Sequence, residues 1–431
     1  MCNNIVKPLD KQIKWQDCEV GVVYHFDLPV YAEGGWTVHI HKPMDPDLYN
    51  PSKLDTDQWL EAAKAVGAGY AIFTATHFNG FLQWQSDLYP YGLKQSKWRS
   101  GKGDVVRDFI DSCRKYGIEP GLYLSCHRNT YWKVDKHKVN WGEGDDEEQK
   151  NFNQICEKMV KELCSRYGDL FQIWFDAGVK TPEEGGPDVI PIVDKYQPNM
   201  VFYHSLQRAE HRWIGNEDGV AGYPCWATIP TVKSHGYAHK QNRRDILFHG
   251  DPEGRAWSPG MCDMPLRDHD WFWKPNREDR IEPLETLFDC YYKSVGRNCN
   301  LLLGLTPDRD GLMPEPDMKR LEELGNEITR RFGKAVAQTD GDGEMVELKL
   351  DKPAIINHVS IMEDIAYGER VREYVLEGLL PGDKWQKICD GISIGHKRIQ
   401  QFEPVEAKAV RLRCIKSIER PKIRNLSVFN A

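Results

Sequence analysis

Residues 55–76, DTDQWLEAAKAVGAGYAIFTAT, contain a helical pattern followed directly by an apolar strand pattern. Asp55 stands where a helix N-cap is expected, and apolar residues recur through Val66 at helical spacing. The run 69–76 is almost entirely apolar, which is typical of a strand that is buried on both faces. A helix followed by such a strand is the repeating unit of a parallel α/β protein.

The same alternation continues on both sides of this stretch. Further strands are expected at 20–26, 119–126, 170–176, 200–204 and 301–305, with helices at 104–116, 147–167 and up to about 331. Roughly 300 residues of this repetition fit a (β/α)8 barrel better than an open doubly wound sheet. No G-x-G-x-x-G or P-loop motif follows a strand, so nucleotide binding has no support.

The pattern changes near residue 335. Thirteen of the 14 tryptophans precede this point, and from 344 onward apolar residues alternate with polar ones, as in EMVELKLD and AVRLRCIK. This period of two indicates an antiparallel β-sandwich. The sequence therefore predicts a catalytic barrel domain at 1–334 and a sandwich at 335–431. The sandwich is expected to pack against the barrel and to stabilise it, with carbohydrate binding left open.

Composition excludes several classes of protein. The 431 residues carry a net charge of −8, so no basic surplus favours nucleic acid or anionic lipid. No apolar run approaches the ~20 residues of a membrane helix. The 12 cysteines form no C-x-x-C pair and are expected to be mostly buried thiols. Cys2 is open to two interpretations, an ordinary terminal residue or a lipid-acceptor cysteine; the second accords with a periplasmic or extracellular location.

Two acids are the candidate catalytic groups. A barrel enzyme carries such groups at the C-terminal ends of its strands, and Asp176 ends the apolar run LFQIWFD. A carboxylate buried there costs free energy unless it is paired or used. Glycoside cleavage needs a second acid, and Glu217 in RWIGNE is a candidate, although by spacing alone it is one of many loop acids. The tryptophan surplus is compatible with stacking on sugars and with filling a large core.

Several longer segments resemble one family. They include ATHFNGFLQWQS, EPGLYLS, IWFDAG, RWIGNEDG and YYKSVGRNCNLLLGLTPDRDGL. The chain resembles the family 29 glycoside hydrolases, the α-L-fucosidases, and within them the branch that prefers linked fucose over small aryl fucosides. The similarity spans about residues 15–332. The C-terminal segment resembles the discoidin-type sandwich that often accompanies glycosidases.

The resemblance implies a retaining double displacement without cofactor or metal. Asp176 matches the family's nucleophile and Glu217 its acid/base, which implies carboxyl groups roughly 5–5.5 Å apart. The residues implied to contact the sugar are His25, Trp36, His77, Phe78, Trp84, Tyr123 and Trp273, with Trp271 beside the last of these.

The sequence also departs from the family pattern. Phe78 and Asn79 replace a histidine and an aspartate of K-H-H-D-G-F, Asp27 replaces a glycine of H-F-G-x-N, and Met261 replaces the glutamate of W-x-P-A-E-C-D. Two alternatives therefore stay open. One is a hydrolase of a related sugar, an α-L- or β-D-galactoside, with the same acid pair. The other is a catalytically weakened protein that only binds sugar.

The histidine spacings His39-x-His41 and His235-x3-His239 are compatible with metal ligands, but no cysteine or acid cluster accompanies them. No metal is expected.

Overall fold

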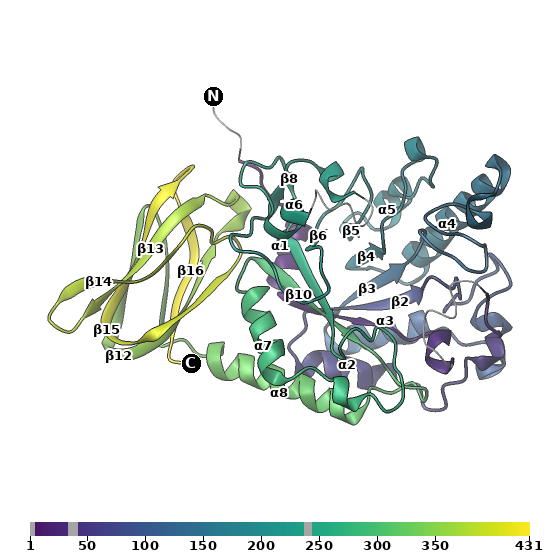
Figure 1. Cartoon of the computed structure of the whole chain (residues 1–431), viewed down its shortest axis with the longest axis horizontal. Coiled ribbons are helices and arrows are strands. Elements are labelled where there is room, and N and C mark those ends of the chain that lie inside the picture. The colour runs from purple at the N-terminus through teal and green to yellow at the C-terminus, as the bar shows by residue number, and fades with distance from the viewer. Residues whose placement is uncertain (1–4, 33–41, 237–243) are drawn as a thin grey trace.

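The computed structural model describes residues 5–32, 42–236 and 244–431. Its larger part is a nearly closed barrel of eight parallel strands in the order β5-β4-β3-β2-β1-β10-β9-β6 (Figure 1). The strands are β1 Val20–Tyr24, β2 Tyr70–Thr76, β3 Glu119–Leu124, β4 Gln172–Phe175, β5 Val201–Tyr203, β6 Arg212–Trp213, β9 Gly260–Pro265 and β10 Cys299–Leu305. The predicted barrel is confirmed, and β1, β2 and β10 are buried along their whole length, as expected for a parallel sheet covered by helices.

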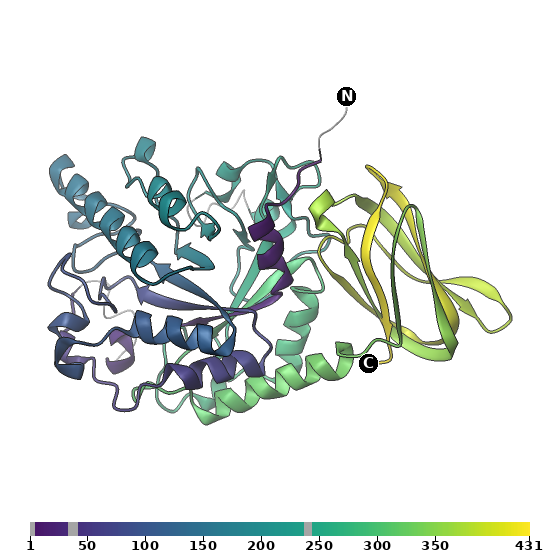
Figure 2. The same ribbon diagram turned by 180° about the vertical axis from the view of Figure 1, so that it is seen from behind.

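Helices follow the strands and cover the outside of the barrel (Figures 1 and 2). They are α1 Asp10–Asp17, α2 Thr56–Ala65, α3 Val105–Tyr116, α4 Asp146–Arg166, α5 Ile190–Tyr196, α6 Arg244–His249, α7 Leu284–Lys293 and α8 Glu315–Phe332. The expected cap is present, because the Asp55 carboxylate accepts hydrogen bonds from the backbone N–H groups of Asp57 and Gln58. A short hairpin, β7 Thr228–Ile229 with β8 Ala256–Trp257, lies in the long connection between β6 and β9.

The C-terminal part is an antiparallel sheet around its own core. Its strands are β11 Ala337–Asp342, β12 Met345–Glu363, β13 Val371–Leu380, β14 Lys384–Gly391, β15 Arg398–Ser417 and β16 Lys422–Phe429, in the order β11-β16-β12-β15-β13-β14. The long strands β12 and β15 lose register between Lys349 and Ala354 and again between Ile356 and His358. Such irregularities bend a strand. Apolar side chains from both halves of β12 enter one buried cluster, as the predicted β-sandwich requires.

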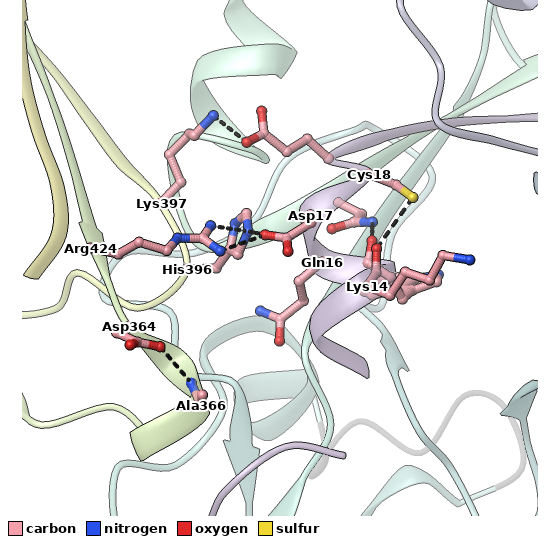
Figure 3. Close-up of polar contacts among 12 residues, drawn as sticks. Lys14, Gln16, Asp17, Cys18, Asp364, Ala366, His396, Lys397 and Arg424 are labelled. Carbon is pink, nitrogen blue, oxygen red and sulfur yellow. Dashed lines mark hydrogen bonds and ion pairs between the residues drawn. The ribbon is translucent and has the colours of Figure 1, made fainter. Parts of the chain in front are cut away.

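The sandwich contacts the barrel at several places, among them α1, α8 and the connection between β6 and β9. Figure 3 shows the Asp17 carboxylate accepting hydrogen bonds from His396 Nε2 and Arg424 Nη1, both at 2.8 Å. The rings of Phe332, the last residue of α8, and Phe429 meet edge to face at 5.3 Å. The backbone N–H of Ala227 donates to both oxygens of buried Glu369 at 3.0 Å. The expected packing of the sandwich on the barrel is present.

Among the cysteines in the described ranges, all are free thiols and most are buried, as expected, while Cys2 lies outside those ranges. Within the same ranges, none of the helices combines the length and the apolar character that crossing a membrane requires.

Candidate active site

Asp176 lies directly after β4, at the C-terminal end of the barrel. Its backbone N–H donates to Leu124 O of β3 at 3.3 Å, and its carboxylate Oδ2 accepts a hydrogen bond from the Tyr123 hydroxyl at 2.7 Å. The chain then turns sharply, because Ala177 (φ 55°) and Gly178 (φ 80°) are both left-handed. For alanine this conformation costs about 1–2 kcal/mol. Such strain is common where a fold holds a side chain for function.

Glu217 lies in the loop after β6. This loop is fastened to β9 by two backbone hydrogen bonds of 3.0 Å, from Ile214 N–H to Met261 O and from Gly219 N–H to Asp263 O. The Glu217 side chain is exposed, and its Oε2 accepts a hydrogen bond from Trp271 Nε1 at 3.0 Å. The acid that matches the family's proton donor is therefore open to solvent on one side and held by an aromatic ring on the other.

The two acids are electrostatically coupled. Burial raises the pKa of Asp176 above its ordinary value, and the negative charge of Glu217 raises this pKa further. Hydrogen bonds from the Tyr123 hydroxyl and the Ala177 N–H, together with the charge of Arg128, oppose this rise. The structure thus brings the two sequence-predicted carboxyl groups to one site, where the charge of Glu217 disfavours ionisation of Asp176.

A third carboxyl group, Asp263 of β9, was not predicted from the sequence. It is buried, and its Oδ1 accepts a hydrogen bond from Trp213 Nε1 at 2.7 Å. Burial and the charges of Glu217 and Asp176 raise the pKa of Asp263 well above its ordinary value. Because its backbone carbonyl also accepts from Gly219 N–H, Asp263 fastens the Glu217 loop on both sides of the acid.

Histidine and aromatic rings form the wall beside the acids. His25 follows β1 and His77 follows β2, and their rings lie 5.6 Å apart. The His77 ring stacks on Tyr123 at 5.3 Å, and the His25 ring lies 5.1 Å from Trp271. Phe272, the residue after Trp271, also belongs to this wall, and its ring centre lies 5.0 Å from that of His77. These residues come from far apart in the sequence and meet because the strand ends converge at one rim.

His25 has a free hydrogen-bonding atom at this wall. Its Nδ1 is buried and has no hydrogen-bond partner among the residues that the structure describes. Burial lowers the pKa of His25 to about 3, so the imidazole is neutral at neutral pH. A neutral ring nitrogen can accept or donate a hydrogen bond, which suits recognition of a sugar hydroxyl.

Phe78 is half-buried next to His77, with the two rings 4.4 Å apart. The guanidinium of Arg128 lies 5.5 Å from the Phe78 ring centre, within cation–π range. Arg128, in the loop after β3, is a second group at the site that was not predicted from the sequence. It is also ion-paired to Asp135 at 2.7 Å.

Two of the sequence departures are partners in space. Asn79 Nδ2 donates to Asp27 Oδ2 at 2.9 Å, and both side chains are buried. Burial raises the pKa of Asp27 to about 7. The family pattern has a carboxyl group at position 79 and glycine at position 27. In this chain the carboxyl group is at position 27, and the amide at position 79 donates to it.

The remaining predicted contacts have different outcomes. The prediction for Trp84 is wrong, because its ring is fully buried in the main core and its Nε1 donates to Glu162 Oε2 of α4 at 2.8 Å. A ring enclosed in this way has no face for a sugar. Trp273 is half-buried, with the Arg309 guanidinium 5.9 Å from its ring. Trp36 lies outside the described residues.

His39, His41 and His239 also lie outside the described residues. Among the residues that the structure describes, no three histidine, cysteine or acidic side chains are arranged to hold a metal ion.

A parallel barrel with acids among aromatic rings at its C-terminal rim is the architecture of a sugar-processing barrel enzyme, and comparison with known proteins specifies the family. The α-L-fucosidase family profile matches residues 10–331. The chain belongs to the α-L-fucosidase family of glycoside hydrolases.

Individual relatives share nearly the whole chain. Alpha-L-fucosidase 1 of Arabidopsis thaliana is 29% identical over 99% of this chain and 88% of that protein. A candidate α-L-fucosidase of rice (Oryza sativa subsp. japonica) is 31% identical over 98% of this chain and 84% of its own. A crystal structure of a candidate α-L-fucosidase from Bacteroides thetaiotaomicron VPI-5482 superposes with a TM-score of 0.94 at 48% identity, over 99% of this chain and 100% of that chain. The similarity includes the C-terminal sandwich.

Proposed function

We propose that the protein is a retaining exo-α-L-fucosidase acting on linked fucose, with Asp176 as nucleophile and Glu217 as acid/base. The observation that supports this most is that the charge of Glu217 acts on Asp176 at the rim where the buried Nδ1 of His25 has no partner among the described residues. Family membership supports the sugar, and the names of the Arabidopsis and rice relatives agree with it.

In the first step, a carboxylate oxygen of Asp176 attacks the anomeric carbon as the glycosidic C–O bond breaks. Glu217 gives its proton to the departing oxygen, so the aglycone leaves as a neutral alcohol. In the second step, Glu217 takes a proton from water, whose oxygen attacks the anomeric carbon and breaks its bond to Asp176. Two inversions at the anomeric carbon restore its configuration.

The environments of the two acids suit these roles. Asp176 is held by the Tyr123 hydroxyl and the neighbouring backbone, which fixes its direction of attack. Glu217 faces solvent, where the aglycone leaves and water enters. His25 and the ring wall provide polar and apolar contacts for the sugar itself.

The direct test is product analysis by ¹H NMR on a panel of fucosylated and galactosylated oligosaccharides. We expect fucose to appear first as the α-anomer and then to equilibrate with the β-anomer. Early β-anomer would identify an inverting enzyme, and galactose release would identify a galactosidase. Saturable sugar binding without any product would identify a sugar-binding protein.

Replacing Tyr123 by phenylalanine is expected to move the acid limb of the kcat/KM profile to higher pH. Attack needs an ionised Asp176, so activity is lost as pH falls through the Asp176 pKa. The Tyr123 hydroxyl lowers that pKa, and its loss therefore makes inactivation begin at a higher pH. A hydrogen bond to a charged group contributes ~1.5–3 kcal/mol, which corresponds to about one to two pH units.

Tyr89→Phe is the matched control for this prediction. It also removes a buried tyrosine hydrogen bond, from the hydroxyl to Gly80 O at 2.7 Å, but not one to Asp176. Equal acid limbs in wild type and Tyr123→Phe would show that Asp176 does not set the limb.

Phe78 is expected to limit hydrolysis of simple aryl α-L-fucosides. Phenylalanine cannot donate or accept a hydrogen bond at a position where the family pattern has histidine, and one unpaired buried group costs on the order of 1–3 kcal/mol. Phe78→His should therefore raise kcat/KM for aryl fucosides by about 5- to 150-fold. Robust wild-type turnover that the substitution does not improve would show that Phe78 does not govern recognition.

The structure argues for testing Phe78→His without Asn79→Asp. A carboxyl group at position 79 would stand within hydrogen-bond distance of Asp27, and one of the two would have to hold a proton. Failure of the double variant would then reflect this pair and not the new histidine.

A further inference from the structure

Two arginines face each other where the sandwich meets the barrel. Arg297 follows α7, Arg398 begins β15, and their backbones form an antiparallel bridge. The α7 helix lies on the side of the barrel that faces the sandwich (Figure 1). Like charges placed directly across an antiparallel pair destabilise it unless something compensates.

Neither arginine forms an ion pair within the described part of the chain. The charge of Asp289 acts on Arg297, but Asp289 is ion-paired to Lys293. Arg297 Nη1 donates to Ala221 O at 2.5 Å, and Arg398 Nη1 donates to Gly296 O at 3.0 Å. The Arg398 guanidinium also lies over the Tyr223 ring at 4.1 Å, and its buried Nε has no partner in the described ranges. These contacts hold the two guanidinium groups in place but leave donors unused.

The two side chains line a cavity of about 260 Å³. It is lined by Asp289, Tyr292, Lys293, Arg297, Arg398, Ile399, Gln400 and Gln401. Asp289 is occupied by Lys293, with Oδ2 and Nζ 2.5 Å apart. Three cations and one anion leave a net charge of +2 on the lining. The volume is just below the ~300–1,000 Å³ of pockets that take drug-sized ligands, so a small anion or one substituted sugar unit fits it.

We propose that Arg297 and Arg398 form a binding site for a tetrahedral oxyanion of the sulfate or phosphate class. Guanidinium groups bind such oxygens in paired, charge-assisted hydrogen bonds. The anion would offset the mutual repulsion of the two arginines and connect the barrel to the sandwich. Burial and the charge of Arg398 lower the pKa of Arg297, and the charge of Asp289 offsets this only in part.

The site is separate from the candidate active site. Arg297 precedes the first residue of β10, whereas the last residue of β10, Leu305, accepts a hydrogen bond from the His25 backbone. A rise of ~3.3 Å per residue puts about 20 Å between the two ends of this strand. Occupancy can therefore be tested without measuring turnover, and a failure of the proposed catalytic function would not affect the result.

The test is titration of the full-length protein with sodium sulfate and sodium phosphate at constant ionic strength, followed by calorimetry and melting temperature. Sulfate also stabilises proteins by exclusion from their surfaces, but that effect rises without saturation. We expect saturable binding of one anion per chain. Arg297→Gln and Arg398→Gln should each weaken it at least tenfold, and the double variant should abolish it.

Arg424→Gln is the matched control. Arg424 also lies where the sandwich meets the barrel, but it pairs with Asp17 and does not line the cavity (Figure 3). It should keep wild-type anion affinity. Titration with galactose 6-sulfate, and with galactose as its uncharged counterpart, then distinguishes a sulfate ester on a sugar from a free inorganic anion. Arginine-dependent binding of the sulfated sugar alone would indicate a sulfate ester, and binding of inorganic anion alone would indicate a free ion.

If one single variant does not fold, equilibrium dialysis of labelled sulfate with the wild type and the other single variant decides the matter. Unsaturated uptake by the wild type, or saturable uptake unchanged in the arginine variants, would overturn the proposal.

Discussion

Asp176→Ala should reduce kcat/KM for fucosides by at least about 10⁴-fold, the scale seen when a nucleophile is removed. Alanine cannot form the covalent bond to the anomeric carbon, and no other acid has the same position against the Tyr123 hydroxyl. Initial rates on linked and aryl fucosides measure the loss. The effect should be large for all leaving groups, because the missing group attacks in the same step in which each of them departs.

The fold should survive this change. Burial raises the pKa of Asp176, so ionised Asp176 costs folding free energy, and its removal should leave the melting temperature equal or higher. Asp169→Ala is the matched control, since this exposed acid lies just before β4, at the opposite end of the same strand. It should keep full activity. More than a tenth of wild-type activity in folded Asp176→Ala would assign the nucleophile elsewhere.

The sequence was sufficient for the barrel and for the acid at the end of β4. Apolar runs such as 69–76 and 170–176 have few alternatives to a buried parallel strand, and the polar residue after such a run is placed at the rim by the fold. The two-residue strand β6 was not predictable in this way, because Arg212–Trp213 is too short to carry any period. Glu217 was therefore identified only through the family resemblance.

The residues that were missed depend on barrel closure. Asp263 is distant in sequence from both acids and meets them only because β9 lies between β10 and β6. Its segment, GMCDMP, has no period that marks an acid facing the site. The error at Trp84 has the opposite cause. A tryptophan near a strand end can stack on a sugar or pack into the core. The hydrogen bond from Trp84 to Glu162 of α4, 78 residues away, holds this ring in the core.

The departures from the family pattern are another feature whose relation in space could not be predicted from sequence spacing. Asp27 and Asn79 were separate anomalies in the sequence, yet they form one buried hydrogen bond. Between them, the two positions keep the one carboxyl group that the family pattern has there. Phe78 is not paired with a second departure in this way: the Arg128 guanidinium lies 5.5 Å from its ring centre and the His127 ring 6.4 Å from it. We therefore expect the change in substrate preference to arise from Phe78 rather than from the other pair.

Glu217→Ala should have an effect that depends on the leaving group. Without a proton donor, a linked sugar must depart as an alkoxide, so kcat/KM for oligosaccharides should fall by about 10²–10⁴-fold. The acidic phenol of an activated aryl fucoside leaves as a stable phenolate and needs no proton, so the first step should be almost unchanged. The second step still lacks its base. Added azide should restore turnover, because it attacks the anomeric carbon without needing a base and gives a fucosyl azide of retained configuration.

Asp218→Ala, at the neighbouring exposed acid, should behave as wild type. A uniform loss over all leaving groups, with no azide product, would contradict the assignment of Glu217. It would turn attention to Asp263, whose pKa is raised by burial and by both acids and which would then be the carboxyl group able to donate a proton.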